Sequence, residues 1–170
     1  MKKNPKILII GSTGKLGSML LHFCSKNKIQ VLAITGFKNQ KKLRLQRNKF
    51  NIKNAFLLNN RNDDLKFKNF LITQKIDLVY FLDYGCESIL YVDLFLKNNS
   101  KSYIAIANKE MVIAGGSLLI NKIISTNNEL IPLDSEHFSL SNFDFKKNFI
   151  KKIFITASGG PFYPKKKIDL

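Results

Sequence analysis

The sequence predicts an α/β fold: a Rossmann-like, doubly wound and mostly parallel sheet, followed by the beginning of a second, α+β domain. Two observations support this prediction. Short runs of β-branched and leucine residues alternate with segments whose apolar residues recur at helical spacing. The first of these runs leads through a glycine-containing loop into a helical pattern. We place the first domain at residues 1–130 and the start of the second at residues 131–170.

The expected strands and helices alternate regularly along the chain. Continuous apolar runs are typical of strands that a parallel sheet buries on both faces, and they occupy residues 6–10, 30–34, 55–58, 76–82, 103–107, 129–133 and 149–156. Helical patterns lie between them at residues 16–23, 43–50, 63–73, 87–97 and 111–124. Asn62 and Asp63 are the candidate caps of the helix at 63–73. Repeated segments of these lengths indicate βαβ units.

The formal net charge is +16, from 28 basic and 12 acidic residues. Such an excess raises the question of a nucleic acid or another anionic partner. Only Arg44, Arg47 and Arg61 are arginines, and the lysines are spread along the chain. We therefore interpret the charge as compositional and expect no nucleic-acid partner. A positive field would still attract a phosphorylated substrate or cofactor.

The two cysteines, Cys24 and Cys86, lie in helical and apolar contexts without the spacing of a disulfide framework or a zinc site. Free cysteines of this kind fit a reduced, cytoplasmic setting. No apolar run approaches the ~20 residues of a membrane span, so we expect no membrane partner.

Gly11, Gly14 and Gly17 lie between the first expected strand and the first helix. Gly11 and Gly14 can form a tight turn whose main-chain N–H groups approach a pyrophosphate, and Gly17 permits close packing of helix on sheet. The spacing G-x-x-G-x-x-G is looser than G-x-G-x-x-G. We interpret the segment as a nucleotide-binding loop, with a purely structural turn as the alternative.

The segment after the second expected strand indicates which dinucleotide would bind. A site selective for NADH has an acidic residue there for the ribose 2′-hydroxyl. Residues 35–42 contain none, and Lys38, Lys41 and Lys42 provide cations instead. These suit the 2′-phosphate of NADPH, and a solvated helix start is the alternative for each lysine.

Three further polar clusters each follow an expected strand: residues 108–110 (Asn-Lys-Glu), residues 134–137 (Asp-Ser-Glu-His), and Ser158 with two glycines after it. In an extended backbone, Asp134 and Glu136 would project their carboxylates from the same side, as a pair of oxygen ligands for Mg²⁺ or Mn²⁺. The simpler alternatives are solvent-facing carboxylates, a capping Asn108 and a plain turn at Ser158.

Taken in this order, four motifs resemble the 1-deoxy-D-xylulose 5-phosphate reductoisomerase family. They are Gly-Ser-Thr-Gly-Lys-Leu-Gly at 11–17, Ala-Asn-Lys-Glu at 107–110, Pro-Leu-Asp-Ser-Glu-His at 132–137 and Thr-Ala-Ser-Gly-Gly-Pro-Phe at 156–162. The resemblance spans essentially the whole chain. It implies an enzyme of non-mevalonate isoprenoid biosynthesis that rearranges 1-deoxy-D-xylulose 5-phosphate and reduces it with NADPH to 2-C-methyl-D-erythritol 4-phosphate.

The resemblance also implies roles for residues at matching positions. The cofactor pyrophosphate loop would include Thr13, Gly14, Lys15 and Leu16 beside Gly11, the 2′-phosphate would meet Lys38 and Asn39, and Asn108 and Glu110 would lie by the cofactor. Lys109 would contact the substrate and act in catalysis with Asp134 and Glu136, the two metal ligands. Ser135, Glu136 and Ser158 match substrate-binding positions. A hard cation would act as Lewis acid and template for the rearrangement.

The chain also departs from the family pattern. Family members are more than twice as long, so we expect the third metal carboxylate, the active-site flap and the C-terminal helical domain to be missing, and this chain alone to be inactive. Phe37 replaces a glycine, and residues 83–88 (Asp-Tyr-Gly-Cys-Glu-Ser) differ from the usual glycine- and alanine-rich loop. The family forms homodimers, which we regard as doubtful for this chain.

Three other functions stay open at this point. The chain could be a non-catalytic NADPH-binding or interaction module derived from that enzyme. It could be another Rossmann-type dehydrogenase, although it has no convincing Tyr-x-x-x-Lys pair or catalytic cysteine motif. A nucleic-acid role comes last, and steeply salt-dependent DNA retention would revive it.

Overall fold

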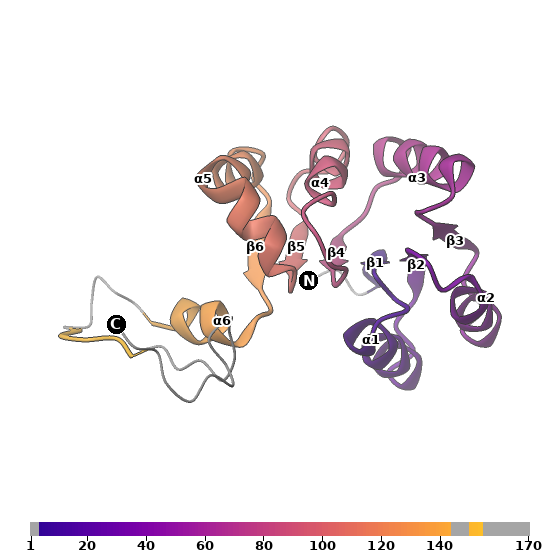
Figure 1. Ribbon diagram of the computed structural model, residues 1–170, viewed down its shortest axis with the longest axis horizontal. Helices are drawn as coiled ribbons and strands as arrows, with labels where there is room; N and C mark the ends of the chain where they lie inside the picture. Colours follow the sequence, from indigo (N-terminus) through magenta and orange to yellow (C-terminus); the bar gives the residue numbers. More distant parts are fainter. Residues whose placement is uncertain (1–3, 144–149, 155–170) are drawn as a thin grey trace, which may run out of the picture. The chain divides into compact units, whose positions relative to one another are not determined.

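The computed structural model describes residues 4–143 and 150–154. Its strands are β1 (Ile7–Ile10), β2 (Val31–Gly36), β3 (Asn54–Leu57), β4 (Leu78–Phe81), β5 (Tyr103–Ile106) and β6 (Glu129–Pro132). Its helices are α1 (Lys15–Lys26), α2 (Gln40–Lys49), α3 (Arg61–Thr73), α4 (Ile89–Leu96), α5 (Lys109–Ser125) and α6 (Ser135–Ser141). The chain therefore alternates strand and helix, as the sequence predicts (Figure 1).

One parallel sheet organises the fold. Its strand order is β3-β2-β1-β4-β5-β6, and every neighbouring pair is parallel. The direction of winding reverses between β1 and β4, because the chain moves outward through β2 and β3 and then returns to the other side of β1. This arrangement confirms the predicted Rossmann-like, doubly wound sheet.

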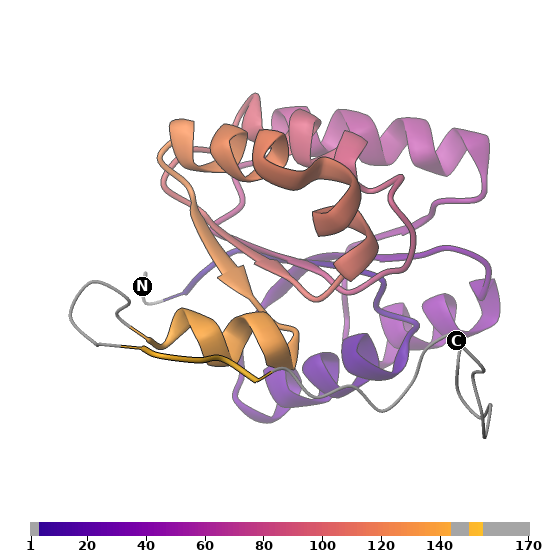
Figure 2. The ribbon, with the colours of Figure 1, turned by 60° about the vertical axis from the view of Figure 1, so that its left-hand side comes forward.

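Helices cover both faces of the sheet. Helices α1 and α2 lie on one face, and α3, α4 and α5 lie on the other (Figure 1 and Figure 2). Alternate residues of β1 face opposite layers: Ile7 and Ile9 pack with Leu21 of α1, whereas Leu8 and Ile10 pack in the layer that contains Phe67 of α3. All four β1 residues are buried. Burial on both faces explains why this strand reads as a continuous apolar run.

The packing of α1 differs from the prediction. The apolar pattern that indicated this helix was Leu16, Met19, Leu20 and Phe23, but Leu16, Met19 and Phe23 are more than half exposed. The residues that α1 buries are Gly17, Leu21 and Cys24. Helical spacing identified the helix correctly and its buried side wrongly, because a glycine on the inner side carries no hydrophobic signal.

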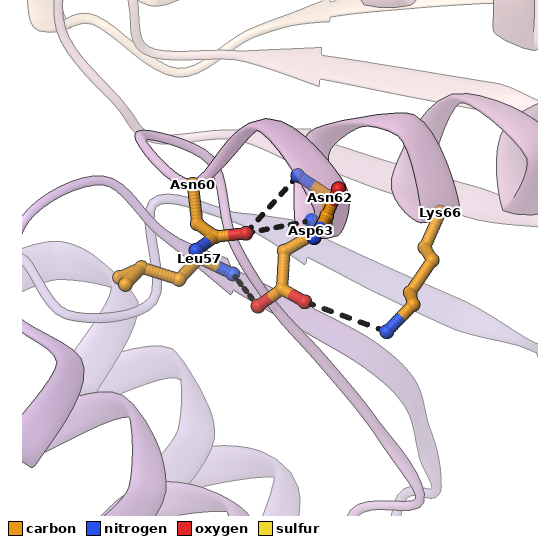
Figure 3. Close-up of polar contacts among 5 residues, drawn as sticks. All are labelled: Leu57, Asn60, Asn62, Asp63 and Lys66. Atoms are coloured by element: carbon orange, nitrogen blue, oxygen red, sulfur yellow. Dashed lines mark hydrogen bonds and ion pairs between the residues drawn. The ribbon is translucent and has the colours of Figure 1, made fainter.

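The cap of α3 also differs from the prediction. Asn60, rather than Asn62 or Asp63, is the N-cap, and its Oδ1 accepts from the backbone N–H groups of both of those residues at 3.1 Å (Figure 3). Asp63 instead accepts a hydrogen bond from the backbone N–H of Leu57 at 3.2 Å. The carboxylate therefore covers a donor at the end of β3, a strand at the edge of the sheet.

The contact pattern divides the chain into two compact units, Met1–Asp134 and Ser135–Leu170. The first contains the whole sheet and helices α1 to α5. In the second, the described residues form α6, and residues 150–154 of the expected strand at 149–156 form no strand. The predicted domain boundary after residue 130 stays a prediction.

Candidate functional site

The loops that follow β1, β2 and β5 carry the predicted site residues between positions 11 and 110. In parallel strands, all these loops leave the sheet at the same, carboxyl edge. The order of the strands therefore brings together residues that lie up to about a hundred positions apart in the sequence.

The glycine loop after β1 has the geometry that the sequence predicts. Gly11 has φ +84°, and a Cβ there would lie 2.6 Å from the backbone N of Asp83. A Cβ on Gly17 would lie 2.5 Å from the carbonyl oxygen of Gly11, so this glycine lets α1 start directly against the loop. Gly14 has φ −71° and ψ 179°, and a Cβ there would meet only the Gly11 oxygen, at 3.4 Å. Of the three glycines of this loop, Gly11 and Gly17 are thus the two that the structure requires.

The start of α1 fits an anionic ligand. Its N-cap is Gly14, which has no side chain to cap the helix, and its first turn contains no acidic residue. Lys15 and Leu16 are exposed beside it. The first N–H groups of a helix have no intrahelical partner and carry the positive end of the helix dipole. Pyrophosphate oxygens are suitable acceptors for them.

Buried polar residues hold the glycine loop in place, and the sequence reasoning missed them. The single proton of the Ser12 hydroxyl has two acceptors within hydrogen-bond distance, the backbone oxygen of Thr35 at 3.0 Å and Oε1 of Gln46 at 2.9 Å. Gln46 Nε2 donates back to the backbone oxygen of Ser12 at 2.8 Å, and the hydroxyl oxygen of Thr35 accepts from the Gly11 N–H at 3.1 Å. The one sequence signal for this network was Gln46 itself, a glutamine on the side of α2 that also carries the buried Leu43.

Lys38 and Asn39 follow β2 and are exposed. Asn39 is the N-cap of α2, because its Oδ1 accepts from the backbone N–H of Lys42 at 2.9 Å. The amide group of Asn39 keeps its donor for a ligand, and Lys38 adds a cation one residue earlier. No acidic residue lies in the first turn of α2, which agrees with the preference for a 2′-phosphate.

Asp83 and Asn108 form a network between the loops after β4 and β5. The Ser88 hydroxyl donates to Asp83 Oδ2, and Asn108 Nδ2 donates to Asp83 Oδ1 at 3.4 Å and to the Gly85 oxygen at 2.7 Å. Desolvation raises the pKa of the Asp83 carboxyl, an effect that the hydrogen bonds from Ser88 and Asn108 oppose. The sequence marks residues 83–88 as an unusual loop, but no motif in it singles out Asp83 as a site residue.

The structural alternative for Asn108 has direct support. Its Oδ1 accepts from the backbone N–H of Met111 at 3.0 Å, so Asn108 caps α5 while its Nδ2 ties down the preceding loop. The whole residue is only 2% exposed, so contact between Asn108 and a cofactor stays a prediction. Lys109 is exposed and Glu110 half-buried in the first turn of the same helix.

The predicted metal ligands fall on different local structures. Asp134 follows β6, whereas Glu136 lies in the first turn of α6, where the Ser135 hydroxyl donates to its Oε2 at 2.7 Å. The condition of an extended backbone is therefore not met at Glu136, because Ser135–Ser141 is helical, and the metal-ligand role of the pair stays a prediction. In the part of the chain that the structure describes, no group of three histidine, cysteine or acidic side chains is placed to hold a metal ion. Ser158 lies outside the described residues.

A groove of about 810 Å³ runs between α2 and the edge strand β3. Its lining includes Arg44, Arg47 and Lys53. The groove is lined by residues of α2, the helix that Asn39 caps, but by no residue of the glycine loop and not by Asp83. We assign it no part in the site at the carboxyl edge. No helix among the described residues is long and apolar enough to cross a membrane.

The sheet order and the glycine loop define a Rossmann-like α/β protein, and comparisons with known proteins narrow this class. The family model described as 1-deoxy-D-xylulose 5-phosphate reductoisomerase matches residues 7–91, and that of the C-terminal domain of the same enzyme matches residues 130–170. The chain belongs to the 1-deoxy-D-xylulose 5-phosphate reductoisomerase family.

Individual relatives agree with this assignment. The enzyme of that name from Pelagibacter ubique is 39% identical over 92% of this chain and 46% of its own length, and that from Francisella tularensis subsp. novicida is 34% identical over 100% and 49%. The Zymomonas mobilis enzyme, solved in complex with NADPH, has a TM-score of 0.75 and 25% identity over 96% of this chain and 48% of its own. The chain thus spans about half the length of the relatives it matches.

A more distant neighbour shares the fold alone. The scyllo-inositol dehydrogenase of Lactobacillus casei has a TM-score of 0.58 at 15% identity. The Rossmann-like sheet is thus common to proteins with different substrates, and the family assignment depends on the sequence motifs.

Proposed function

We propose that this chain is the NADPH-binding part of a 1-deoxy-D-xylulose 5-phosphate reductoisomerase. The whole enzyme would isomerise 1-deoxy-D-xylulose 5-phosphate and reduce it to 2-C-methyl-D-erythritol 4-phosphate, in a reaction that depends on NADPH and a divalent metal. The observation that carries the proposal is the glycine loop after β1, whose conformation requires Gly11 and leaves an uncapped helix start beside it. The Zymomonas mobilis relative, solved in complex with NADPH, supports it.

Named residues of this chain would hold the dinucleotide. Main-chain N–H groups of residues 13–16 would bind the pyrophosphate, and Lys38 with the Asn39 amide would bind the 2′-phosphate. When bound, NADPH supplies the hydride that reduces the rearranged substrate. The protein contributes the position of that cofactor, through the Ser12 and Gln46 bonds that fix the loop.

The catalytic part of the proposal rests on fewer residues. Lys109 is exposed at the start of α5, where its cation would oppose negative charge that develops on substrate oxygens. Ser135 and Ser158 are proposed to contact the substrate. Asp134 and Glu136 are proposed as two ligands of Mg²⁺ or Mn²⁺, but the described residues do not complete a donor set for either ion. We therefore derive no catalytic step through the metal.

A second candidate function is a non-catalytic NADPH-binding module derived from the enzyme. The incomplete donor set among the described residues favours it. Both functions need the same cofactor, and they differ in whether additional polypeptide, in cis or in trans, restores turnover. For either function we propose a cytoplasmic protein, because Cys24 and Cys86 are free thiols. A homodimer is not part of the proposal.

Titration with NADPH and NADH, each with and without Mg²⁺, tests the cofactor assignment. We expect NADPH to bind at least tenfold more tightly than NADH, and Lys38→Ala to remove most of that preference. Asp134→Ala should leave NADPH binding unchanged, because Asp134 is assigned to the metal. A folded chain that binds neither nucleotide would contradict the proposal, and a chain that binds both equally would contradict the role of Lys38.

A further inference from the structure

The carboxyl of Asp83 is held from two sides at the carboxyl edge of the sheet. Ser88, just before α4, donates to one of its oxygens, and Asn108, just before α5, donates to the other. Asn108 is itself fixed, because its Nδ2 also donates to Gly85 and its Oδ1 accepts from the backbone N–H of Met111. These bonds give the carboxyl a defined place between the loops after β4 and β5.

The position of Asp83 relative to a bound dinucleotide follows from the sheet order. A dinucleotide crosses the sheet where the strand order reverses, here between β1 and β4, with its pyrophosphate at the start of α1. The adenosine half lies on the side of β2, where Lys38 and Asn39 are found. The nicotinamide half must then extend over the ends of β4 and β5. Asp83 lies at that end of β4, with its backbone against Gly11.

The two redox forms of the nicotinamide differ in charge. The ring of NADP⁺ carries a positive charge and the ring of NADPH is neutral, while the phosphates are the same in both. A carboxylate in a partly desolvated site stabilises a nearby cation more than it would in water. It therefore lowers the free energy of the oxidised form relative to the reduced form.

We propose that Asp83 is a specificity-determining residue that shifts the binding preference of this site from NADPH toward NADP⁺. The inference rests on the proposed function, since it requires a dinucleotide at this edge. Asp83 is the acidic residue of this loop that Ser88 and Asn108 hold in place, and Glu87 is the second acidic residue of the same loop. An uncharged residue at position 83 would favour the reduced form.

The inference carries a pH dependence whose sign is fixed. Burial raises the pKa of Asp83, and Glu87 on the same loop acts in the same direction. Tyr91 on α4 also interacts electrostatically with Asp83, and its hydroxyl donates to Asp64 of α3 at 2.7 Å. Only the ionised carboxyl attracts the oxidised ring. The preference for NADP⁺ should therefore weaken as the pH falls through the raised pKa.

Calorimetric titration of the purified chain with NADP⁺ and with NADPH tests the inference. The quantity compared is the ratio of the two Kd values, in which the shared 2′-phosphate and pyrophosphate cancel. At pH 8 we expect Asp83→Asn to raise Kd(NADP⁺)/Kd(NADPH) about fivefold. Asp93→Asn is the matched control, because it removes the same charge from the middle of α4, where Asp93 pairs with Lys122. It should leave the ratio unchanged.

A second measurement keeps the test independent of the folding of the variant. In the unaltered chain the ratio should rise as the pH is lowered from 8 toward the ordinary carboxyl pKa of about 3.9, in titrations completed within minutes because the reduced form is acid-labile. A ratio that is flat with pH, or unchanged by Asp83→Asn in a folded variant, would overturn the inference and leave the proposed function intact. Failure of the folded chain to bind either form defeats both.

Discussion

Gly11 and Gly17 are the residues of the glycine loop at which a side chain has no room. The neighbours of a Cβ at these positions are backbone atoms, which cannot rotate away as a flexible side chain could. Glycine is required at both positions because the backbone is close on each side. Gly11 lies against the backbone of Asp83 at the end of β4, and Gly17 lies against the backbone of the glycine loop.

Gly17→Ala should destabilise the chain and weaken NADPH binding, because α1 must move away from the loop to accommodate the methyl group. We expect a loss of roughly 1–3 kcal/mol in the free energy of unfolding, measured by urea denaturation, and at least a tenfold rise in the Kd for NADPH. Gly14→Ala is the control, since its Cβ would make only a 3.4 Å contact. Equal stability losses in the two variants would contradict the packing argument.

Asp83→Asn should change stability in a pH-dependent way. A carboxyl whose folded-state pKa is raised contributes stability below its ordinary pKa of about 3.9 and loses it as the pH rises through the raised value. The raised pKa of Asp83 therefore costs the folded state stability near neutral pH. The free energy of unfolding of the variant, minus that of the unaltered chain, should grow from pH 4.5 to pH 7.5. A difference that stays constant with pH would show that the pKa of Asp83 is not raised in the folded chain.

At the scale of elements, hydrogen bonds at helix ends decide where several helices begin. Asn39, Asn60 and Asn108 each cap a helix that follows a strand, at α2, α3 and α5. Each cap positions a loop at the carboxyl edge of the sheet, so capping and the geometry of the site are linked. α1 is different, because Gly14 leaves its first N–H groups to a ligand.

Asn60→Ala should lower the free energy of unfolding by about 1 kcal/mol, since two backbone N–H groups of α3 lose their acceptor. Asn59→Ala is the control, as the neighbouring asparagine is exposed and caps nothing. Thermal or urea unfolding of both variants measures the difference. Equal effects would show that the cap in Figure 3 does not stabilise α3.

Gln46→Ala tests the connection between α2 and the glycine loop. The change leaves the buried Ser12 without its partner on α2, which should cost roughly 1–3 kcal/mol and raise the Kd for NADPH. Gln40→Ala removes an exposed glutamine from the same helix and should barely affect stability. Binding that stays unchanged in Gln46→Ala would mean that the loop holds its shape without α2.

At the scale of the whole molecule, the net charge of +16 should act on any anionic ligand. We expect NADPH to stabilise the chain by about 2.7 kcal/mol at a hundred times its Kd, and its Kd to rise between 50 and 300 mM salt as the positive field is screened. The melting temperature at fixed NADPH, measured across this salt range, checks both effects. A melting temperature that does not respond to NADPH would argue against a dinucleotide site.

The sequence by itself determined the alternation of strands and helices, the parallel sheet and the glycine loop. These features are encoded locally, because burial on both faces of β1 requires an unbroken apolar run and the turn at Gly11 requires a positive φ. The four motifs at 11–17, 107–110, 132–137 and 156–162 were likewise readable in order along the chain, and together they pointed to the family.

Only the tertiary structure decided which side of α1 is buried, that Gln46 holds Ser12, and that Asp83 meets Asn108. These pairs lie 34 and 25 residues apart, and nothing in the local pattern encodes a contact at such a separation. The motif at 134–137 also did not reveal that Glu136 is helical. Two carboxylates two residues apart are compatible both with the end of a strand and with the start of a helix. The contacts of Ser12 and Asp83, by contrast, form only when the parallel sheet assembles and brings these distant segments together.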